Sequence, residues 1–314
     1  MRRLGIASVL AAGLIAFHGE AASKSEEPVV SDHQKEIEAW RQARLTKLRS
    51  DEGWLVVAGL SWLEAGKNGG KNGFGSAADN AVVLPAHSAP AHAGVLELAE
   101  GKVTLVPAPG VALQMGGRAL AGRQELRSDE PGPADVVSLG DLRFFVIVRD
   151  GRIGVRLRDL RSPRRSEFPG LTYFPVRDEY RVNARFLPHD GAKGPVTLKI
   201  ANVLGKISDM SSPGKLVFTL AGQTLSLDAV QEAPTDTRLF VIFRDATAGH
   251  ETYGAGRFLY SEGLPKEGHV VLDFNKAYNP PCALTPFATC PLPPAQNRLK
   301  VRIEAGEKAL PGEH

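Results

Sequence analysis

The segment at residues 279–294 restricts the fold of this chain more than any other. It contains both cysteines of the protein, Cys282 and Cys290, and it is rich in proline. Proline fixes φ and lacks a backbone N–H, so this segment can form neither a helix nor an interior strand. Three apolar side chains in it can still pack on a core: Leu284, Phe287 and Leu292. We therefore expect an ordered loop held against the body of the protein.

Residues 1–21 have the features of a secretory signal peptide. A basic start at Arg2 and Arg3 precedes an apolar stretch over residues 4–17, and residues 19–21 form a small-residue cleavage site. The apolar stretch is too short to span a bilayer comfortably, so we expect no membrane span after cleavage. The sequence therefore predicts a periplasmic or secreted protein that begins after residue 21.

An oxidising compartment and an even cysteine count predict a disulfide between Cys282 and Cys290. Closing so short a loop contributes about 2.5 kcal/mol in the chain-entropy model. A redox-active pair would have C-x-x-C spacing, and two thiols without a nearby histidine make a poor zinc site. We therefore expect a structural disulfide, no bound metal and no cofactor.

The formal net charge of the 314-residue chain is +3, and charges of both signs are mixed along it. This distribution does not indicate a nucleic-acid partner. One basic run, residues 156–165, contains five arginines. It is either a solvated strand end and loop or a surface for an anionic partner.

Residues 31–50 are predicted to form a helix. Ser31 and Gln34 match a capping box at its start. Four apolar residues fall on one arc of the helical wheel: Ile37, Trp40, Leu45 and Leu48. Arg41 and Arg44 lie on the same arc, which indicates either snorkelling or a structural ion pair, or else side chains that reach a ligand site.

From residue 51 onward the pattern is almost entirely β. Short apolar stretches alternate with turn residues at the spacing of a sandwich or barrel, which predicts one β domain at 51–160 and a second, antiparallel sandwich or barrel, at 170–306. In the second domain, strict alternation over 215–230 predicts a hairpin. Residues 238–245 repeat 143–150 with six identities in eight. The predicted fold is all-β behind an N-terminal helix.

The first domain contains a recurring set of short strand and glycine motifs. They are Phe74-Gly75-Ser76, Asp79-Asn80-Ala81-Val82-Val83-Leu84, Gly101-Lys102-Val103-Thr104-Leu105, Met115-Gly116-Gly117 and Val137-Ser138-Leu139-Gly140-Asp141. Over residues 70–148 this rhythm resembles a forkhead-associated (FHA) sandwich. An FHA domain reads phosphothreonine with an arginine after its first glycine and a serine–histidine pair three residues apart. Here Ser76 takes the first position and Ser88 and His92 are four apart, so the resemblance implies the fold without phosphopeptide recognition.

The second half of the chain carries several long, unusual motifs. They are Arg244-Asp245-Ala246-Thr247, Glu251-Thr252-Tyr253-Gly254-Ala255-Gly256-Arg257, Asp273-Phe274-Asn275-Lys276-Ala277-Tyr278-Asn279-Pro280-Pro281-Cys282 and Ala288-Thr289-Cys290-Pro291-Leu292-Pro293-Pro294. Together with Asn297-Arg298-Leu299, Trp54-Leu55 and Gly59-Leu60-Ser61-Trp62-Leu63, they resemble an uncharacterised bacterial domain-of-unknown-function family with an NPPC…TCPLPP signature, over nearly the whole mature chain. The resemblance implies no settled activity and no catalytic residue.

Polar side chains gather in two segments, 250–257 and 273–279, each next to an apolar strand of the second β domain. Strand ends can place both segments at one rim, so we expect them to converge on one site. Its candidate ligand-binding residues are Arg244, Tyr253, Arg257, Asn275, Tyr278 and Asn279. Two carboxylates, Glu251 and Asp273, are candidates for acid and base in glycoside or ester hydrolysis. Alternatively, they pair structurally with the two arginines.

Two functions therefore compete. The first is a binding or interaction module whose polar cleft in the C-terminal β domain recognises a small molecule, glycan or peptide. The alternative is a hydrolase that uses Glu251 and Asp273. No G-x-S-x-G or H-E-x-x-H motif supports catalysis, and we favour the module.

Overall fold

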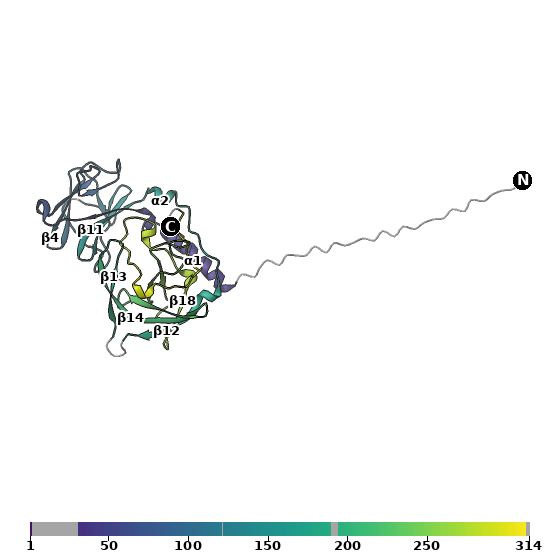
Figure 1. Ribbon diagram of the computed structural model, residues 1–314. Helices are drawn as coiled ribbons and strands as arrows, with labels where there is room; N and C mark the ends of the chain where they lie inside the picture. Colours follow the sequence, from purple (N-terminus) through teal and green to yellow (C-terminus); the bar gives the residue numbers. More distant parts are fainter. Residues whose placement is uncertain (2–30, 121, 190–193, 312–314) are drawn as a thin grey trace.

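The computed structural model describes residues 1, 31–120, 122–189 and 194–311. Apart from Met1, the predicted signal peptide lies outside the described residues. An N-terminal helix is followed by two β units, which confirms the predicted all-β class (Figure 1). In Figure 1, β4 and β11 mark the N-terminal β unit, and β12, β14 and β18 mark the C-terminal β unit, with α1 beside it. No helix among these residues is long and apolar enough to cross a membrane.

Helix α1 spans Asp32–Arg49, and its start is capped as predicted, since Oγ of Ser31 accepts a hydrogen bond from the backbone N–H of Gln34 at 3.1 Å. Ile37 and Leu48 are buried. The short helices elsewhere are α2 (Pro163–Ser166), η1 (Trp54–Val56), η2 (Lys67–Gly70), η3 (Asp178–Tyr180), η4 (Phe274–Lys276), η5 (Pro281–Ala283) and η6 (Ala295–Asn297).

The N-terminal β unit consists of two sheets that share one core. The first has the strand order β1 (Val57–Trp62), β11 (Arg152–Asp159), β10 (Leu142–Arg149), β9 (Val137–Leu139), β6 (Gln114–Met115) and β7 (Arg118–Ala119). The second has the order β3 (Val82–Val83), β2 (Lys71–Gly75), β4 (Gly94–Ala99), β5 (Lys102–Pro107) and β8 (Gln124–Leu126). Apolar side chains from both sheets form one buried cluster, in which the rings of Phe74 and Phe144 lie 5.4 Å apart. The FHA resemblance of this unit stays a prediction.

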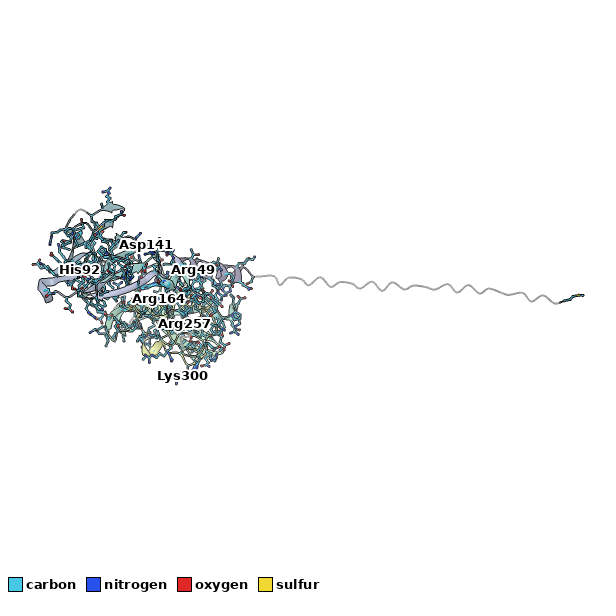
Figure 2. All side chains as sticks on the ribbon, turned by 90° about the horizontal axis from the view of Figure 1, so that it is seen from above. Arg49, His92, Asp141, Arg164, Arg257 and Lys300 are labelled. Carbon is cyan, nitrogen blue, oxygen red and sulfur yellow. The ribbon has the colours of Figure 1, made fainter. Side chains whose placement is uncertain are left out.

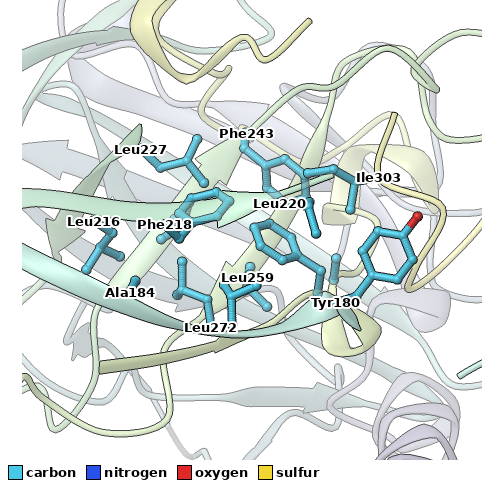
Figure 3. Close-up of a cluster of buried hydrophobic side chains, with 14 of the residues drawn as sticks. Tyr180, Ala184, Leu216, Phe218, Leu220, Leu227, Phe243, Leu259, Leu272 and Ile303 are labelled. Atoms are coloured by element: carbon cyan, nitrogen blue, oxygen red, sulfur yellow. The ribbon is translucent and has the colours of Figure 1, made fainter. Parts of the chain in front are cut away.

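The C-terminal β unit is a single seven-stranded antiparallel sheet. Its order is β17 (Arg257–Tyr260), β16 (Phe240–Phe243), β15 (Gln223–Gln231), β14 (Ile207–Leu220), β12 (Arg181–Pro188) and β18 (His269–Asp273), and β13 (Val196–Ala201) pairs with β14. The predicted hairpin is confirmed: Leu216 pairs with Leu227, and Phe218 with Leu225. Their alternating side chains point into the core shown in Figure 3.

The proline-rich segment is an ordered loop, as predicted, and its main chain pairs with the C-terminal sheet. The N–H of Leu292 donates to Ala201 O at 2.7 Å, and the N–H of Val203 donates to Cys290 O at 3.0 Å. A buried cluster that includes Cys290, Ile200 and Phe240 lies on the side of this sheet that packs against Trp54. The loop therefore joins the surface where the two β units meet.

Candidate functional site

The two segments that the sequence predicts to converge do lie side by side. Phe258, just after the first segment, and Tyr278, in the second, exchange two backbone hydrogen bonds of 2.9 Å each. A third stretch, residues 303–309, which we call the C-terminal segment, contacts both: the N–H of Ala309 donates to Glu251 O at 2.9 Å, and Nδ2 of Asn279 donates to Lys308 O at 2.7 Å.

Arg257 is a buried member of this arrangement, with 1% of its surface exposed. Figure 2 shows it among the side chains of the C-terminal β unit. Its guanidinium donates to Asp245 Oδ1 at 3.3 Å, to Ile303 O at 3.0 Å and to Ala305 O. Burial lowers the pKa of Arg257, although Asp245 opposes that effect. This arginine thus ties β17 to the C-terminal segment.

Asp273 is equally buried and has both oxygens occupied. Oδ1 accepts hydrogen bonds from the backbone N–H and from Nδ2 of Asn275, at 3.0 and 2.9 Å, while Oδ2 lies 2.7 Å from Nε2 of His33. Asn275 in turn bonds both main-chain groups of Arg177. These contacts hold the end of β18 against α1 and η3.

Asn279 and Tyr278 pack around a buried ion pair. Glu307, fully buried in the C-terminal segment, receives hydrogen bonds from Arg44 and from the N–H of Asn279 at 2.8 Å. The Arg44 guanidinium also lies 4.4 Å from the centre of the Tyr278 ring. Burial raises the pKa of Tyr278 to about 12. Arg44 therefore forms the structural ion pair that its position on the helical wheel suggested.

The remaining predicted residues lie nearer the surface. Glu251 forms an ion pair with Arg302 and keeps 39% of its side chain exposed. Arg244 is exposed and donates to Gly254 O at 3.0 Å, and Tyr253 is half-buried. The sequence-predicted site thus divides into a buried hydrogen-bonded network and a few surface groups. In the part of the chain that the structure describes, no three His, Cys, Asp or Glu side chains are grouped to hold a metal.

Cys282 and Cys290 lie next to each other but do not form the predicted disulfide in this structure. Both are thiols, and the backbone N–H of Cys282 lies 3.2 Å from Sγ of Cys290. Hydrogen bonding to Cys282, together with burial, raises the pKa of Cys290. The Cys290 thiol therefore keeps its proton at neutral pH.

A cleft of about 600 Å³ opens between the two β units, away from the predicted site residues. We call it the interdomain cleft. The N-terminal β unit contributes Glu130, Arg149 and Asp150 to its lining. Polar side chains from the other wall include Asn202, Ser208, Asp209, Ser211, Gln231 and Glu232, and the proline-rich loop adds Thr289 and Pro291. Neither Glu251 nor Asp273 is among the described residues that line it.

Asp150 links the two walls of the cleft. Its carboxylate, in the β10–β11 turn, accepts a hydrogen bond from Asn202 Nδ2 at 3.0 Å and another from Ser208 Oγ. Beside it, Arg149 forms a bidentate ion pair with Asp129, at 2.7 and 3.0 Å, and remains partly exposed. On the opposite side Glu232 accepts a hydrogen bond from Tyr260 Oη at 2.9 Å.

The sequence analysis did not find this cleft. One available signal was the Arg-Asp pair that ends both repeated strands, at 149–150 and at 244–245. In the structure the first pair lines the cleft, whereas Asp245 of the second is buried beside Arg257. The two Arg-Asp pairs differ in exposure because the end of β10 faces the other β unit across the cleft, whereas the end of β16 packs beside β17 and the C-terminal segment.

Comparison with known proteins gives one family match. Residues 166–308 match the family described as "Protein of unknown function (DUF1684)". Among solved structures, the uncharacterized protein from gene locus rrnAC0354 of Haloarcula marismortui, determined by solution NMR, is 34% identical. That match covers 48% of this chain and 81% of the other, with a TM-score of 0.39. No curated protein matches the chain. Whether the NPPC…TCPLPP motif is the signature of the matched family stays a prediction. Residues 166–308 of this chain are therefore similar to an uncharacterised domain-of-unknown-function family, DUF1684.

Proposed function

We propose that this protein is a binding module and that the interdomain cleft holds its ligand. The observation that carries the proposal is the cleft itself, about 600 Å³ in volume and lined by both β units. Binding sites for small molecules commonly measure about 300–1,000 Å³ and often lie between domains. The cleft has the size of such a site.

The chemistry of the lining supports a small polar molecule, a glycan or a peptide as the ligand. Charged groups of both signs, hydroxyls and amides alternate with apolar surface from Ile200, Met210 and Pro291. Polar groups of this kind fix the orientation of a ligand, while apolar surface contributes affinity. Because Asp150 already bridges the walls, the cleft has a defined shape before a ligand enters, which lowers the entropy lost on binding.

The positions of the two candidate catalytic carboxylates support binding rather than hydrolysis. Asp273 is 1% exposed and has hydrogen-bond partners at both oxygens, so a substrate has no access to it. Glu251 is paired with Arg302. A general acid or base must come within hydrogen-bond reach of the reacting atoms, and neither carboxylate reaches the cleft.

The proposal is tested by filling the cleft. The mature protein is incubated with metabolite and glycan mixtures, and the retained compounds are identified by mass spectrometry. Thr289→Phe places a bulky ring in the cleft wall, and Thr224→Phe places the same ring at an exposed position of β15. We expect Thr289→Phe to weaken ligand binding at least tenfold and Thr224→Phe to leave it unchanged. Equal binding by the two variants, or no retained compound, would argue against the cleft as a binding site.

We also propose that the protein is exported and that its adjacent cysteines are oxidised there. The support is the signal-like sequence at residues 1–21 and the proximity of the two thiols. In thiol–disulfide exchange with an oxidant that contains a disulfide, the two sulfurs of Cys282 and Cys290 bond to each other. The disulfide of the oxidant is reduced to two thiols, so it takes up the two electrons and two protons. N-terminal sequencing of protein from the periplasm or medium should begin at Ala22, and thiol titration of that protein after denaturation should find no thiol. Two titratable thiols would rule out the disulfide.

A further inference from the structure

A second cavity lies where the end of α1 meets the chain that follows β11. Its volume is about 540 Å³, and it is lined by residues of α1, of the turn after β11 and of α2, namely Arg49, Leu160, Arg161, Ser162, Arg165 and Ser166. We call it the α2 pocket. The basic run at 156–165 begins at Arg156, which is buried, and ends at this pocket. The run is therefore more than a solvated strand end, because two of its arginines line a cavity.

The charged groups that line the α2 pocket are all positive. Three of its lining residues are arginines, and none of the described residues that line it is a carboxylate. The interdomain cleft has the opposite character, because four carboxylates line it against one arginine, Arg149, which is already paired with Asp129. An anion is therefore attracted to the α2 pocket and repelled by the cleft.

Two of the three arginines are held by carboxylates that do not line the pocket. Nε of Arg161 lies 2.9 Å from Oδ2 of Asp141, and Nη1 of Arg165 donates to Oδ1 of Asp51 at 2.8 Å. Asp141 and Asp51 have 52% and 64% of their side chains exposed, so water screens both pairs. Each pair orients a guanidinium through one nitrogen and leaves its other N–H groups for a ligand.

The third arginine, Arg49, is the last residue of α1. Its Nη2 donates to Phe168 O at 3.1 Å, and among the described residues no carboxylate forms an ion pair with it. The charge of Arg49 is therefore not balanced by a neighbouring side chain. Its remaining N–H groups can bind an anion from the side of the pocket opposite to α2.

Ser162 adds a hydroxyl to this positive lining. It is 4% exposed and lines the α2 pocket, but its side chain does not cap α2. Buried hydroxyls in proteins are usually hydrogen-bonded. A hydroxyl that lines a cavity beside three guanidinium groups can donate to an oxygen of a bound anion.

We propose that the α2 pocket is a binding site for an oxyanion of the phosphate class. The site is separate from the interdomain cleft and does not rest on the proposed function. Guanidinium groups bind phosphate oxygens through paired, charge-assisted hydrogen bonds. The negative charge of a phosphate monoester at neutral pH suits a cavity whose charged lining is all positive. A free phosphate compound and the phosphate headgroup of a lipid share this chemistry.

The test compares Arg49→Gln and Arg161→Gln with Arg164→Gln as the matched control. Arg164, labelled with Arg49 in Figure 2, is an exposed residue of α2 in the same basic run, but it does not line the pocket. Its substitution therefore controls for the general positive potential of this surface. The probe is inorganic phosphate, added to the mature protein at pH 7 with the ionic strength held constant by NaCl. Calorimetric affinity and melting temperature are measured for each protein.

We expect phosphate to bind the wild type and Arg164→Gln in a saturable way and to raise their melting temperatures. Arg49→Gln and Arg161→Gln should each lower the affinity for phosphate by about fivefold or more, because each removes a charge-assisted hydrogen bond. Equal affinities in the four proteins would mean that phosphate is attracted only by the diffuse basic surface, and would overturn the inference.

A second arm distinguishes the two sources of the phosphate group. Co-sedimentation with phosphatidylcholine vesicles, with and without phosphatidic acid, is measured for the same four proteins. If only vesicles with phosphatidic acid bind protein, and Arg49→Gln and Arg161→Gln but not Arg164→Gln weaken that binding, the site takes a lipid headgroup. If inorganic phosphate binds as expected and neither kind of vesicle binds protein, the ligand is a soluble phosphate compound. No response in either arm would overturn the inference.

Thr289→Phe separates the α2 pocket from the interdomain cleft. This substitution fills the cleft wall and should leave phosphate binding unchanged. Loss of phosphate binding in Thr289→Phe, with normal binding by Arg49→Gln and Arg161→Gln, would place the anion in the cleft and overturn the inference. Phosphate binding that depends on Arg49 and Arg161 supports the α2 pocket even if the cleft retains no compound, so the two proposals can fail separately.

Discussion

Nε2 of His33 lies 2.7 Å from Oδ2 of Asp273, and its Nδ1 lies 2.6 Å from Oδ1 of Asp178. The imidazole thus joins the first turn of α1 to the end of β18 and to η3. Burial lowers the pKa of His33, but the hydrogen bonds to Asp273 and Asp178 outweigh it, so the pKa is raised overall. Protonated His33 therefore helps to hold the N-terminal helix against the C-terminal β unit, through its contacts with Asp273 and Asp178.

This geometry predicts a pH-dependent stability. Because the folded-state pKa of His33 lies above its unfolded value near 6.5, its contribution is complete below about pH 6.5 and is lost as the pH rises through the folded pKa. We expect the melting temperature of wild type minus that of His33→Gln to be positive at pH 5.5 and to shrink by pH 9. His269→Gln, at an exposed histidine, is the control. A difference that does not change with pH would contradict this role.

The two candidate catalytic carboxylates should differ in their contribution to stability. Asp273→Asn leaves buried donors facing an amide, so we expect unfolding in urea to show a loss of about 1–3 kcal/mol. Glu251→Gln breaks a half-exposed ion pair with Arg302 and should cost about 1 kcal/mol or less. Equal losses in the two variants would refute this division between buried network and surface.

Glu307 should be among the most sensitive positions in the chain. It is fully buried and accepts hydrogen bonds from Arg44 and from the N–H of Asn279. Glu307→Gln leaves Arg44 without a counter-charge, and breaking a buried pair in this way costs about 3–5 kcal/mol. Glu304→Gln, in the same segment but in a solvent-exposed pair with Arg302, should change the free energy of unfolding far less, because water and salt screen that pair. Chemical denaturation of the two variants measures both values, and similar losses would contradict the expectation.

Alanine substitutions at Gly306 and Gly249 should distinguish the cost of a left-handed backbone from the cost of a steric clash. Gly306 and Gly249 have nearly the same φ, +79° and +81°, but a Cβ on Gly306 would lie 2.4 Å from Ala277 O, whereas a Cβ on Gly249 would meet nothing within 4 Å. Alanine in this left-handed conformation costs roughly 1–2 kcal/mol. Gly306→Ala should lose about 1–3 kcal/mol more than Gly249→Ala, because the C-terminal segment must move. If the unfolding curves of Gly306→Ala and Gly249→Ala agree within error, the C-terminal segment can move away from the added methyl group without a measurable loss of stability.

The sequence by itself determined the local elements. Ser31 caps α1, and the apolar arc that contains Ile37 and Leu48 faces the core, because both features depend on residues within a few turns of one helix. Alternation set the register of the hairpin in which Leu216 pairs with Leu227. The prolines of residues 279–294 have a fixed φ and no backbone N–H, so this segment forms a loop. Each of these signals is contained in a short stretch of chain, where backbone geometry and side-chain period decide the outcome.

Only the tertiary structure decided which polar groups are buried and which line a cleft. Asp273 looks like a catalytic candidate in the sequence, but His33, from 240 positions earlier, covers it. Asp150 and Arg156 look like surface charges, yet one bridges two β units and the other is enclosed between them. The exposure of a charged side chain depends on the surfaces that meet over it. Those surfaces come from distant parts of the chain, so no local pattern encodes the result.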